Sequence, residues 1–359
     1  MSYSWSSKRV LVTGGASFIG SHLVDAIVER AAAVRVVDDF SSGLVSNIQR
    51  HVDGGSIELI HGDLRDQDVA ARSVEGIDVV FHLAADHGGR GYVDLHQYGC
   101  STNLGLDALL FGRALDAGVE KVVYASSGCI YPLSIQSDPA ETLFLTEDMA
   151  GPPYEPDGLY GLAKLAGELT LQALHAERGL NTASCRYFTV YGPRGVENHA
   201  VIAMIARAFI RQDPFYVWGT GEQIRNWTYV QDIVDGTILA AERIDDGSAV
   251  NLGTMERVRV LDAVHLVLDQ AGYEPSIVLQ PDMPTGPYNR VADNSLAGRL
   301  LGWEPRVRFA EGLRRTLEWY FETKRPEQVK EILDFMLTGR GAASGKTVAL
   351  EGQTEPVRV

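Results

Sequence analysis

The feature that most constrains the fold is an alternation of short apolar segments with longer helical patterns through the first half of the chain. Apolar runs typical of buried strands occur at 8–13, 33–37, 57–60, 78–83, 121–126 and 182–188, and helical patterns at 18–30, 66–74, 101–117 and 158–178. Parallel strands need a crossover connection, usually a helix, whereas antiparallel strands need only a hairpin. The alternation therefore predicts an α/β fold built on a doubly wound parallel sheet.

The second half of the chain breaks this alternation after Tyr191. Short mixed elements and Gly/Pro turns follow, with one later strand at 249–252 and an amphipathic helix near 310–323. The last residues are rich in Gly, Ser and Thr and have no periodicity, which is typical of a mobile segment. The parts that we expect are a main lobe of residues 1–190 with a return around 228–252, a smaller α/β lobe formed mainly by residues 191–335, and a flexible tail of residues 336–359.

Composition limits the classes of function. The 359 residues carry a formal net charge of -15, which argues against binding to nucleic acid or to an anionic membrane, because both need a basic face. The N-terminus lacks the apolar core of a signal peptide, and no run of about 18 apolar residues occurs. The cysteines at positions 100, 129 and 185 form neither a metal-binding spacing nor an even disulfide set. We expect a cytoplasmic protein with reduced thiols and no bound metal.

A glycine-rich turn, TGGASFIG at 13–20, joins the first strand to the first helix. In such a turn, backbone N–H groups and the start of the helix bind a pyrophosphate. Asp38 ends the second strand, 18 residues beyond Gly20, close to the spacing of an acid that binds ribose hydroxyls. A carboxylate there repels a 2′-phosphate, so the pattern predicts NAD and not NADP. The alternative is a glycine turn with nothing bound.

Strand ends supply the other expected cofactor contacts. The residues predicted to bind NAD are Gly14, Ser17, Phe18, Ile19 and Gly20 in the turn, Asp38 at the ribose, Asp63 and Leu64 at the adenine, and the small residues Ala84 and Ala85. His82 precedes the two alanines, and we interpret it as a packed histidine and not as a catalyst.

These segments resemble the extended short-chain dehydrogenase/reductase family, which contains nucleotide-sugar epimerases and dehydratases. The matching segments are TGGASFIG, the acid at Asp38, GDLRD at 62–66, HLAA at 82–85, Ser127, YGLAK at 160–164, LGWEP at 301–305 and EGL at 311–313. The resemblance covers roughly residues 8–322 and implies a Rossmann fold with a smaller C-terminal substrate-binding lobe. Two positions depart from the family pattern: Ser17 stands where glycine is usual, and Thr189 stands where asparagine is frequent.

The resemblance assigns catalysis to Ser127, Tyr160 and Lys164. A tyrosine with its usual pKa near 10 cannot act as a base at neutral pH. Lys164 follows Tyr160 by four residues, hence lies on the same helix face, and its positive charge is expected to lower that pKa. Tyr160 would then take a proton from a sugar hydroxyl as a hydride passes to NAD, and both Tyr160 and Lys164 would contact the cofactor. For an isolated tyrosine and lysine, the alternative is a surface pair.

Cys129 indicates one branch of the family. The strand YASSGCIYP at 124–132 and the loop AADHGGRG at 84–91 are similar to segments of the GDP-mannose 3,5-epimerases. In that branch the cysteine is one acid/base group and a lysine after the YGP segment is the other; His199 aligns with that lysine. A thiol and an imidazole both titrate within reach of pH 7, so they could invert a carbon beside a transient ketone. The alternative is that Cys129 is a small packing residue.

Further residues are implied at the substrate. The substrate-binding residues implied by the resemblance are Gly89, Arg207, Arg225 and Arg290, whose guanidinium groups suit a diphosphate unless they are solvated surface residues. Together the patterns predict an NAD-dependent nucleotide-sugar epimerase similar to the GDP-mannose 3,5-epimerases, with a nucleotide-diphosphate sugar as substrate and a homodimer as the assembly. Two alternatives stay open: a 4-epimerase acting on UDP-glucose or UDP-glucuronate, and a non-catalytic NAD-binding protein on the same fold.

Overall fold

The computed structural model describes residues 3–138 and 140–339 and is organised around one parallel sheet of seven strands. These strands are β1 (Arg9–Thr13), β2 (Ala33–Asp38), β3 (Glu58–His61), β4 (Val79–His82), β5 (Lys121–Ser127), β6 (Asn181–Tyr187) and β11 (Asp246–Leu252). Their order across the sheet is β3-β2-β1-β4-β5-β6-β11, and each neighbouring pair is parallel. The first six have the order of a doubly wound nucleotide-binding sheet. The predicted fold class is confirmed.

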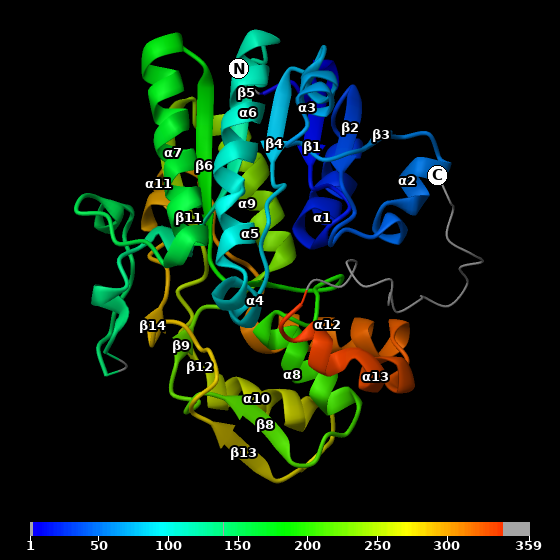
Figure 1. Cartoon of the computed structure of the whole chain (residues 1–359), viewed down its shortest axis with the longest axis vertical. Helices are drawn as coiled ribbons and strands as arrows, with labels where there is room; N and C mark the ends of the chain where they lie inside the picture. Colours follow the sequence, from blue (N-terminus) through cyan, green and yellow to red (C-terminus); the bar gives the residue numbers. More distant parts are fainter. Residues whose placement is uncertain (1–2, 139, 340–359) are drawn as a thin grey trace.

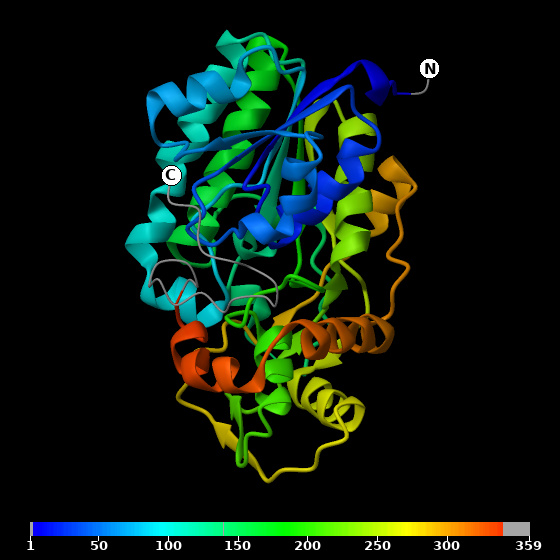
Figure 2. The same cartoon turned by 90° about the vertical axis from the view of Figure 1, so that its right-hand side faces the viewer.

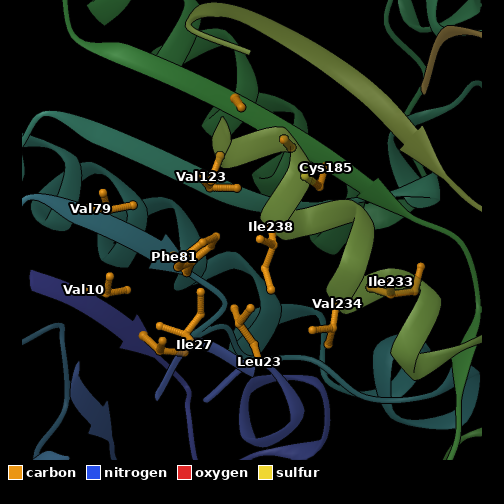
Figure 3. Close-up of a cluster of buried hydrophobic side chains, with 14 of the residues drawn as sticks. Val10, Leu23, Ile27, Val79, Phe81, Val123, Cys185, Ile233, Val234 and Ile238 are labelled. Atoms are coloured by element: carbon orange, nitrogen blue, oxygen red, sulfur yellow. The ribbon is translucent and has the colours of Figure 1, made fainter. Parts of the chain in front are cut away.

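Helices cover both faces of this sheet (Figure 1). They are α1 (Phe18–Val28), α3 (Gln67–Val74), α6 (Asn103–Asp116), α7 (Gly158–Arg178), α9 (Val230–Arg243) and α11 (Ser295–Leu301). The short helices α2 (Gln49–Asp53), α4 (Arg90–Leu95) and α5 (Gln97–Ser101) belong to the same lobe. Successive strand residues point to opposite faces, so Val10 joins the core under α1 and α9, whereas Leu11 joins the core under α3 and α6. Figure 3 shows the first core, where Phe81 of the sheet meets Leu23 of α1 and Ile238 of α9.

The smaller lobe lies beyond the carboxyl ends of the strands. Its elements are β7 (Val190–Tyr191), α8 (Ala200–Phe209), β8 (Phe215–Trp218), β9 (Ile224–Arg225), β10 (Thr228–Tyr229), β12 (Val258–Arg259), α10 (Val260–Gln270), β13 (Ile277–Gln280), β14 (Asn289–Arg290), α12 (Phe309–Thr323) and α13 (Pro326–Met336). Helix α8 is at its centre, and α10, α12 and α13 pack against α8. Figure 2 shows α12 and α13, in orange and red, crossing below the sheet.

The second half of the chain is more regular than expected. Helices α8, α9 and α10 contain 10, 14 and 11 residues, so the expectation of short mixed elements is wrong there. The strand expected at 249–252 lies within β11 and adds an edge to the main sheet. How the chain divides into domains stays a prediction. No helix in the described ranges is long and apolar enough to cross a membrane.

The C-terminal helix α13 was not expected, and it changes where the folded part ends. Met336 ends this helix, Leu337 is buried against α8, and Asn198 Nδ2 donates to the carbonyl of Gly339 at 2.9 Å. The flexible tail predicted from residue 336 is therefore wrong for residues 336–339. Its remaining residues, 340–359, lie outside the described ranges.

A buried ion pair fastens α7 to the sheet. Arg186 of β6 donates to Glu168 of α7 with Nη2 and Oε2 2.9 Å apart, and both side chains are withdrawn from solvent. Ser126 of β5 donates to the same carboxylate. Charges that leave water need partners of this kind, because an unpaired buried charge is strongly destabilising. The pair therefore fixes α7, which carries Tyr160 and Lys164, at a defined height over β5.

Phe81 gives a direct test of the core in Figure 3. We expect Phe81→Ala to lower the free energy of unfolding by about 3–5 kcal/mol, because it removes a fully buried ring from the middle of the sheet. Urea denaturation followed by circular dichroism measures this loss. The matched control is Tyr154→Ala at an aromatic ring that is 47% exposed, where we expect a much smaller change. Equal losses in the two variants would contradict the placement of Phe81.

Candidate active site

Two connected cavities lie at the carboxyl edge of the sheet. The larger, of about 350 Å³, runs between the sheet and the smaller lobe, and the smaller, of about 50 Å³, extends toward Asp38. Gly14 and Ser17 line both. Open α/β sheets bind their ligands at this edge, where the winding of the strands reverses.

All residues predicted for the site line these cavities. The larger is lined by Gly14, Ser17, Phe18, Ile19, Gly20, Ala85, Gly89, Ser127, Cys129, Tyr160, Lys164, His199, Arg207, Arg225 and Arg290. The smaller is lined by Gly14, Ser17, Asp38, Asp63, Leu64, Ala84 and Ala85. The structure thus brings the predicted residues together, while the role of each stays a prediction. Among the described residues, no cluster of three or more His, Cys, Asp or Glu is arranged to hold a metal ion.

The donor groups at the start of α1 fit a dinucleotide. Ser17 is the N-cap of α1, and its side chain makes no capping hydrogen bond. The N–H groups of the first helical turn, which have no partner within a helix, are therefore available to phosphate oxygens. At the end of β2, the Asp38 carboxylate accepts hydrogen bonds from Ala16 N and Phe40 N, each at 2.9 Å. These bonds hold an acidic group at the smaller cavity, as recognition of a ribose requires.

Tyr160 and Ser127 meet where α7 begins beside the end of β5. The N–H of Asp157, the N-cap of α7, donates to the carbonyl of Cys129 at 2.8 Å. A side chain on Gly161 would put its Cβ 2.2 Å from the same oxygen, so only glycine allows this approach. Tyr160, on the first turn of α7, is hydrogen-bonded to Ser127. The serine oxygen also accepts from Cys129 N at 3.1 Å.

The expected effect of Lys164 on Tyr160 is wrong in this structure. Burial, followed by the charge of Cys129, raises the pKa of Tyr160, and the hydrogen bond from Ser127 opposes that rise. The Lys164 ammonium lies 6.0 Å from the centroid of the Tyr160 ring and closer, at 4.6 Å, to that of Tyr124. Burial is the largest cause because it makes the charged phenolate costly, and Lys164 is not among the groups that shift this pKa.

Cys129 has a charged donor beside its sulfur. Arg290 Nη1 donates to Cys129 Sγ at 3.2 Å. The same guanidinium donates to Gln136 Oε1 at 2.8 Å and to Asp157 Oδ2 at 3.0 Å, and these bonds fix its plane. Arg90 also donates to Asp157 Oδ2, at 2.7 Å. Cys129 thus has a cationic donor at its sulfur, held in place by a network of three other side chains.

His199 occupies the N-cap of α8 at the opposite lobe. Burial lowers its pKa to about 4, so the imidazole is neutral at neutral pH, and the expectation that it titrates near pH 7 is wrong in this structure. Its ring centroid lies 6.1 Å from that of His87. The loop of His87 packs tightly on this segment, since a Cβ on Gly89 would lie 1.6 Å from Asn198 O. The AADHGGRG loop therefore positions His199 by backbone contact.

Two further arginines line the cavity in the smaller lobe. Burial lowers the pKa of Arg207 to about 10, and burial together with the nearby Arg290 and Arg90 lowers that of Arg225 to about 9. Arg225 donates to two backbone carbonyls, whereas Arg207 Nε has no hydrogen-bond partner among the described residues. Buried cations of this kind gain free energy from an anionic ligand.

The sequence left other cavity residues unassigned. Asp157 orders Arg90 and Arg290, and its signal was the N-cap position three residues before Tyr160. Leu337 lines the larger cavity at the end of α13. A proline at the helix start and the apolar spacing of α13 could have predicted that helix. Conversely, His82 is buried, and its interpretation as a packed histidine is confirmed; Cys100 and Cys185 are buried as well.

Comparison with known proteins agrees with this geometry. GDP-mannose 3,5-epimerase of Arabidopsis thaliana is 31% identical over 333 residues, which are 91% of this chain and 86% of that protein. The UDP-glucose 4-epimerase of Thermotoga maritima, solved with UDP-glucose, has a TM-score of 0.78 at 30% identity and covers 88% of this chain and 99% of its own. The UDP-glucuronic acid 4-epimerase of Bacillus cereus, solved with UDP-glucuronic acid and NAD, has a TM-score of 0.78 at 27% identity. The match covers 90% of this chain and 99% of that protein's chain.

The sequence profile of one family spans most of the chain. It matches residues 10–253, which contain the glycine-rich turn, Asp38, Ser127, Tyr160 and Lys164. Its members use NAD as their cofactor, and the cavities found here have the donors and the acid that NAD requires. The chain belongs to the NAD dependent epimerase/dehydratase family.

Proposed function

We propose that this enzyme is a nucleotide-sugar epimerase that exchanges protons at carbon 3 or carbon 5 of the sugar, with GDP-mannose or a close relative as substrate. The observation that carries the proposal is the 3.2 Å contact between Arg290 and the sulfur of Cys129 inside the larger cavity. A packing cysteine needs no charged donor, whereas a proton-transfer cysteine does. The similarity to GDP-mannose 3,5-epimerases over 91% of the chain supports the same reading.

Each residue of the cavity has a proposed role that depends on where it lies. When bound, NAD would take a hydride from carbon 4 of the sugar and later return it. Tyr160 and Ser127 would hold the oxygen on that carbon and move its proton, while Lys164 would hold the ribose of the cofactor. A ketone at carbon 4 acidifies the protons on carbons 3 and 5. Cys129 and the neutral His199, on different lobes, would remove and return one such proton from opposite faces.

The arginines of the cavity would bind the diphosphate. Arg207 is buried in the smaller lobe and its Nε has no partner among the described residues, whereas Arg225 is half-buried and donates to two backbone carbonyls. Fork-shaped donors suit phosphate oxygens. Arg290, whose donors already reach Cys129, Gln136 and Asp157, would act at the sugar end of the same cavity. Binding of the diphosphate would thus place the sugar beside Cys129.

The second candidate is a 4-epimerase of UDP-sugars. The similarity to UDP-glucose and UDP-glucuronic acid 4-epimerases favours it, since the structural match includes 99% of the chain of each of those two enzymes. Such an enzyme needs Ser127, Tyr160 and Lys164 but no acid/base group at carbons 3 and 5. In that case Cys129 and its contact with Arg290 would have only a structural role.

Proton exchange separates the two candidates. We expect proton NMR in deuterated water to show deuterium entering carbon 3 or 5 of GDP-mannose, and no inversion of UDP-glucose or UDP-glucuronate at carbon 4. We expect Cys129→Ser to slow this exchange by about 10²–10⁴-fold, because a serine hydroxyl is a far weaker acid/base at neutral pH. The control Cys185→Ala changes a buried cysteine of β6 that lies outside both cavities, and it should keep the wild-type rate.

Inversion at carbon 4 of a UDP-sugar without deuterium uptake would contradict the proposal and support the second candidate. If exchange at carbon 3 or 5 persisted in Cys129→Ser, the proposed reaction would stand, but Cys129 would not be its acid/base group.

Asp38 is expected to set the choice of cofactor. The substitution Asp38→Asn keeps the shape of the side chain but removes the negative charge, together with one of the two oxygens that accept from Ala16 N and Phe40 N. We expect the affinity for NADP relative to NAD to rise about tenfold or more, since the repulsion of a 2′-phosphate is lost. Equilibrium binding monitored by fluorescence of the reduced cofactors measures this ratio. Asp39→Asn, at the next and more exposed carboxylate, is the control; an equal rise there would contradict the assignment to Asp38.

We propose also that the enzyme forms a homodimer through α5, α6 and α7. Exposed apolar side chains on these adjacent helices include Tyr98, Leu104 and Leu162, which are 83%, 41% and 41% exposed. Symmetric dimers commonly bury such surface against its own copy. We expect sedimentation velocity to give a dimer for the wild type and a monomer for Leu104→Glu/Leu162→Glu. A wild-type monomer at micromolar concentration would contradict the proposal.

A further inference from the structure

A chain of buried polar side chains lies behind the predicted catalytic helix. Thr13 of β1 and His82 of β4 are joined by a 2.8 Å contact between Oγ1 and Nδ1. His82 Nε2 lies 3.0 Å from Oδ1 of Asp107 on α6, and the Tyr124 hydroxyl of β5 donates to Oδ2 at 2.5 Å. All four residues are at most 3% exposed. None of these four side chains has a role in the proposed proton and hydride transfers.

The direction of each hydrogen bond follows from the donors. Thr13 Oγ1 accepts from the N–H groups of Leu83 and Ala84, each at 3.0 Å. Its own hydrogen therefore points to His82 Nδ1, which acts as the acceptor. Burial lowers the pKa of His82, so the ring is neutral and carries its one proton on Nε2. That proton is donated to Asp107.

Asp107 thus accepts from both sides. His82 donates to one of its oxygens and Tyr124 donates to the other, and burial raises the pKa of Tyr124 far enough to keep its proton in place. Both oxygens of Asp107 therefore act as acceptors, which is the arrangement of a carboxylate. A buried carboxylate needs a cation nearby, and neither neighbour supplies one.

Lys164 is the cation that faces this carboxylate. Its side chain is 2% exposed, and its ammonium lies 4.6 Å from the centroid of the same Tyr124 ring whose hydroxyl binds Asp107. Burial lowers the pKa of Lys164, and Asp107 is the first of two carboxylates that raise it. The second, Glu168, is already paired with Arg186. The other groups that face Lys164 are the rings of Tyr124, Tyr160 and His82, which are uncharged.

We infer that Asp107 is a positioning residue: across the Tyr124 ring, it supplies the countercharge that keeps Lys164 protonated in a site from which water is excluded. The inference rests on the proposed role of Lys164 at the cofactor. A lysine at this depth would otherwise lose its proton, and with it the ability to donate to a ribose and to act on Tyr160. Asp107 touches neither cavity and works only through Lys164.

The charge of Lys164 can be measured without cofactor or substrate. The chain has six lysines, so labelling of lysine Cε with ¹³C gives few signals, and Lys164→Met identifies that of Lys164. We expect this signal to titrate about 1–3 pH units lower in Asp107→Asn than in the wild type. The control Asp116→Asn makes the same chemical change at an exposed position of α6 and should leave the titration unchanged. Cofactor binding should weaken on the alkaline side in Asp107→Asn alone.

Two results would overturn the inference. A Lys164 signal that titrates at the wild-type pH in a folded Asp107→Asn variant would show that Asp107 supplies no countercharge. A wild-type Lys164 that is already neutral at pH 7 would do the same and needs no variant, so the test survives if Asp107→Asn does not fold. Since neither measurement uses a nucleotide sugar, failure of the proposed substrate would not affect them.

Discussion

The site depends on one backbone contact, the hydrogen bond between the N–H of Asp157 and the carbonyl of Cys129 at 2.8 Å. It brings the first turn of α7 against the end of β5, so that Tyr160 reaches Ser127. It also places the Asp157 carboxylate where it orients Arg290, whose guanidinium reaches Cys129. The two proposed proton-transfer centres, at the sugar oxygen and at the neighbouring carbon, are therefore held by the same few atoms. A shift of α7 would disturb both together.

Exclusion of water shifts the pKa values of the ionisable groups in the cavity toward their neutral forms. The pKa of Tyr160 is raised, and those of Lys164, His199, Arg207 and Arg225 are lowered, with burial as the largest cause in each case. Each shift favours the neutral form, because a charge in such a cavity has lost its hydration. A carboxylate or an anionic ligand that faces such a cation stabilises its charged form. The carboxylate Asp157 serves Arg90 and Arg290, and Asp107 faces Lys164. The diphosphate of a nucleotide sugar would neutralise the charges of the remaining arginines.

Local patterns in the sequence were sufficient for the sheet and for the glycine-rich cofactor turn, whereas the family resemblance supplied the predicted catalytic and substrate residues. The apolar runs and the glycine-rich turn are local, so they predicted the strands of the sheet and the position of Asp38 at the end of β2. What they could not provide were contacts between distant segments. Nothing near Asp107 on α6 indicates that it meets His82 of β4 and Tyr124 of β5. Likewise the spacing of Tyr160 and Lys164 on one helix could not reveal that burial dominates the pKa of the phenol.

The two departures from the family pattern, Ser17 and Thr189, differ in their backbone conformation. Ser17 has a φ of -80°, an ordinary backbone angle, so a side chain costs nothing in conformation where glycine is usual. Thr189 has a φ of +26°, which a β-branched residue rarely adopts and which asparagine tolerates much better. Thr189 also lines the larger cavity, next to Tyr187 and Phe188. Strain at such a position persists only where the surrounding structure enforces it. The serine is thus a neutral replacement in the cofactor turn, whereas the threonine places conformational strain at the wall of the substrate cavity.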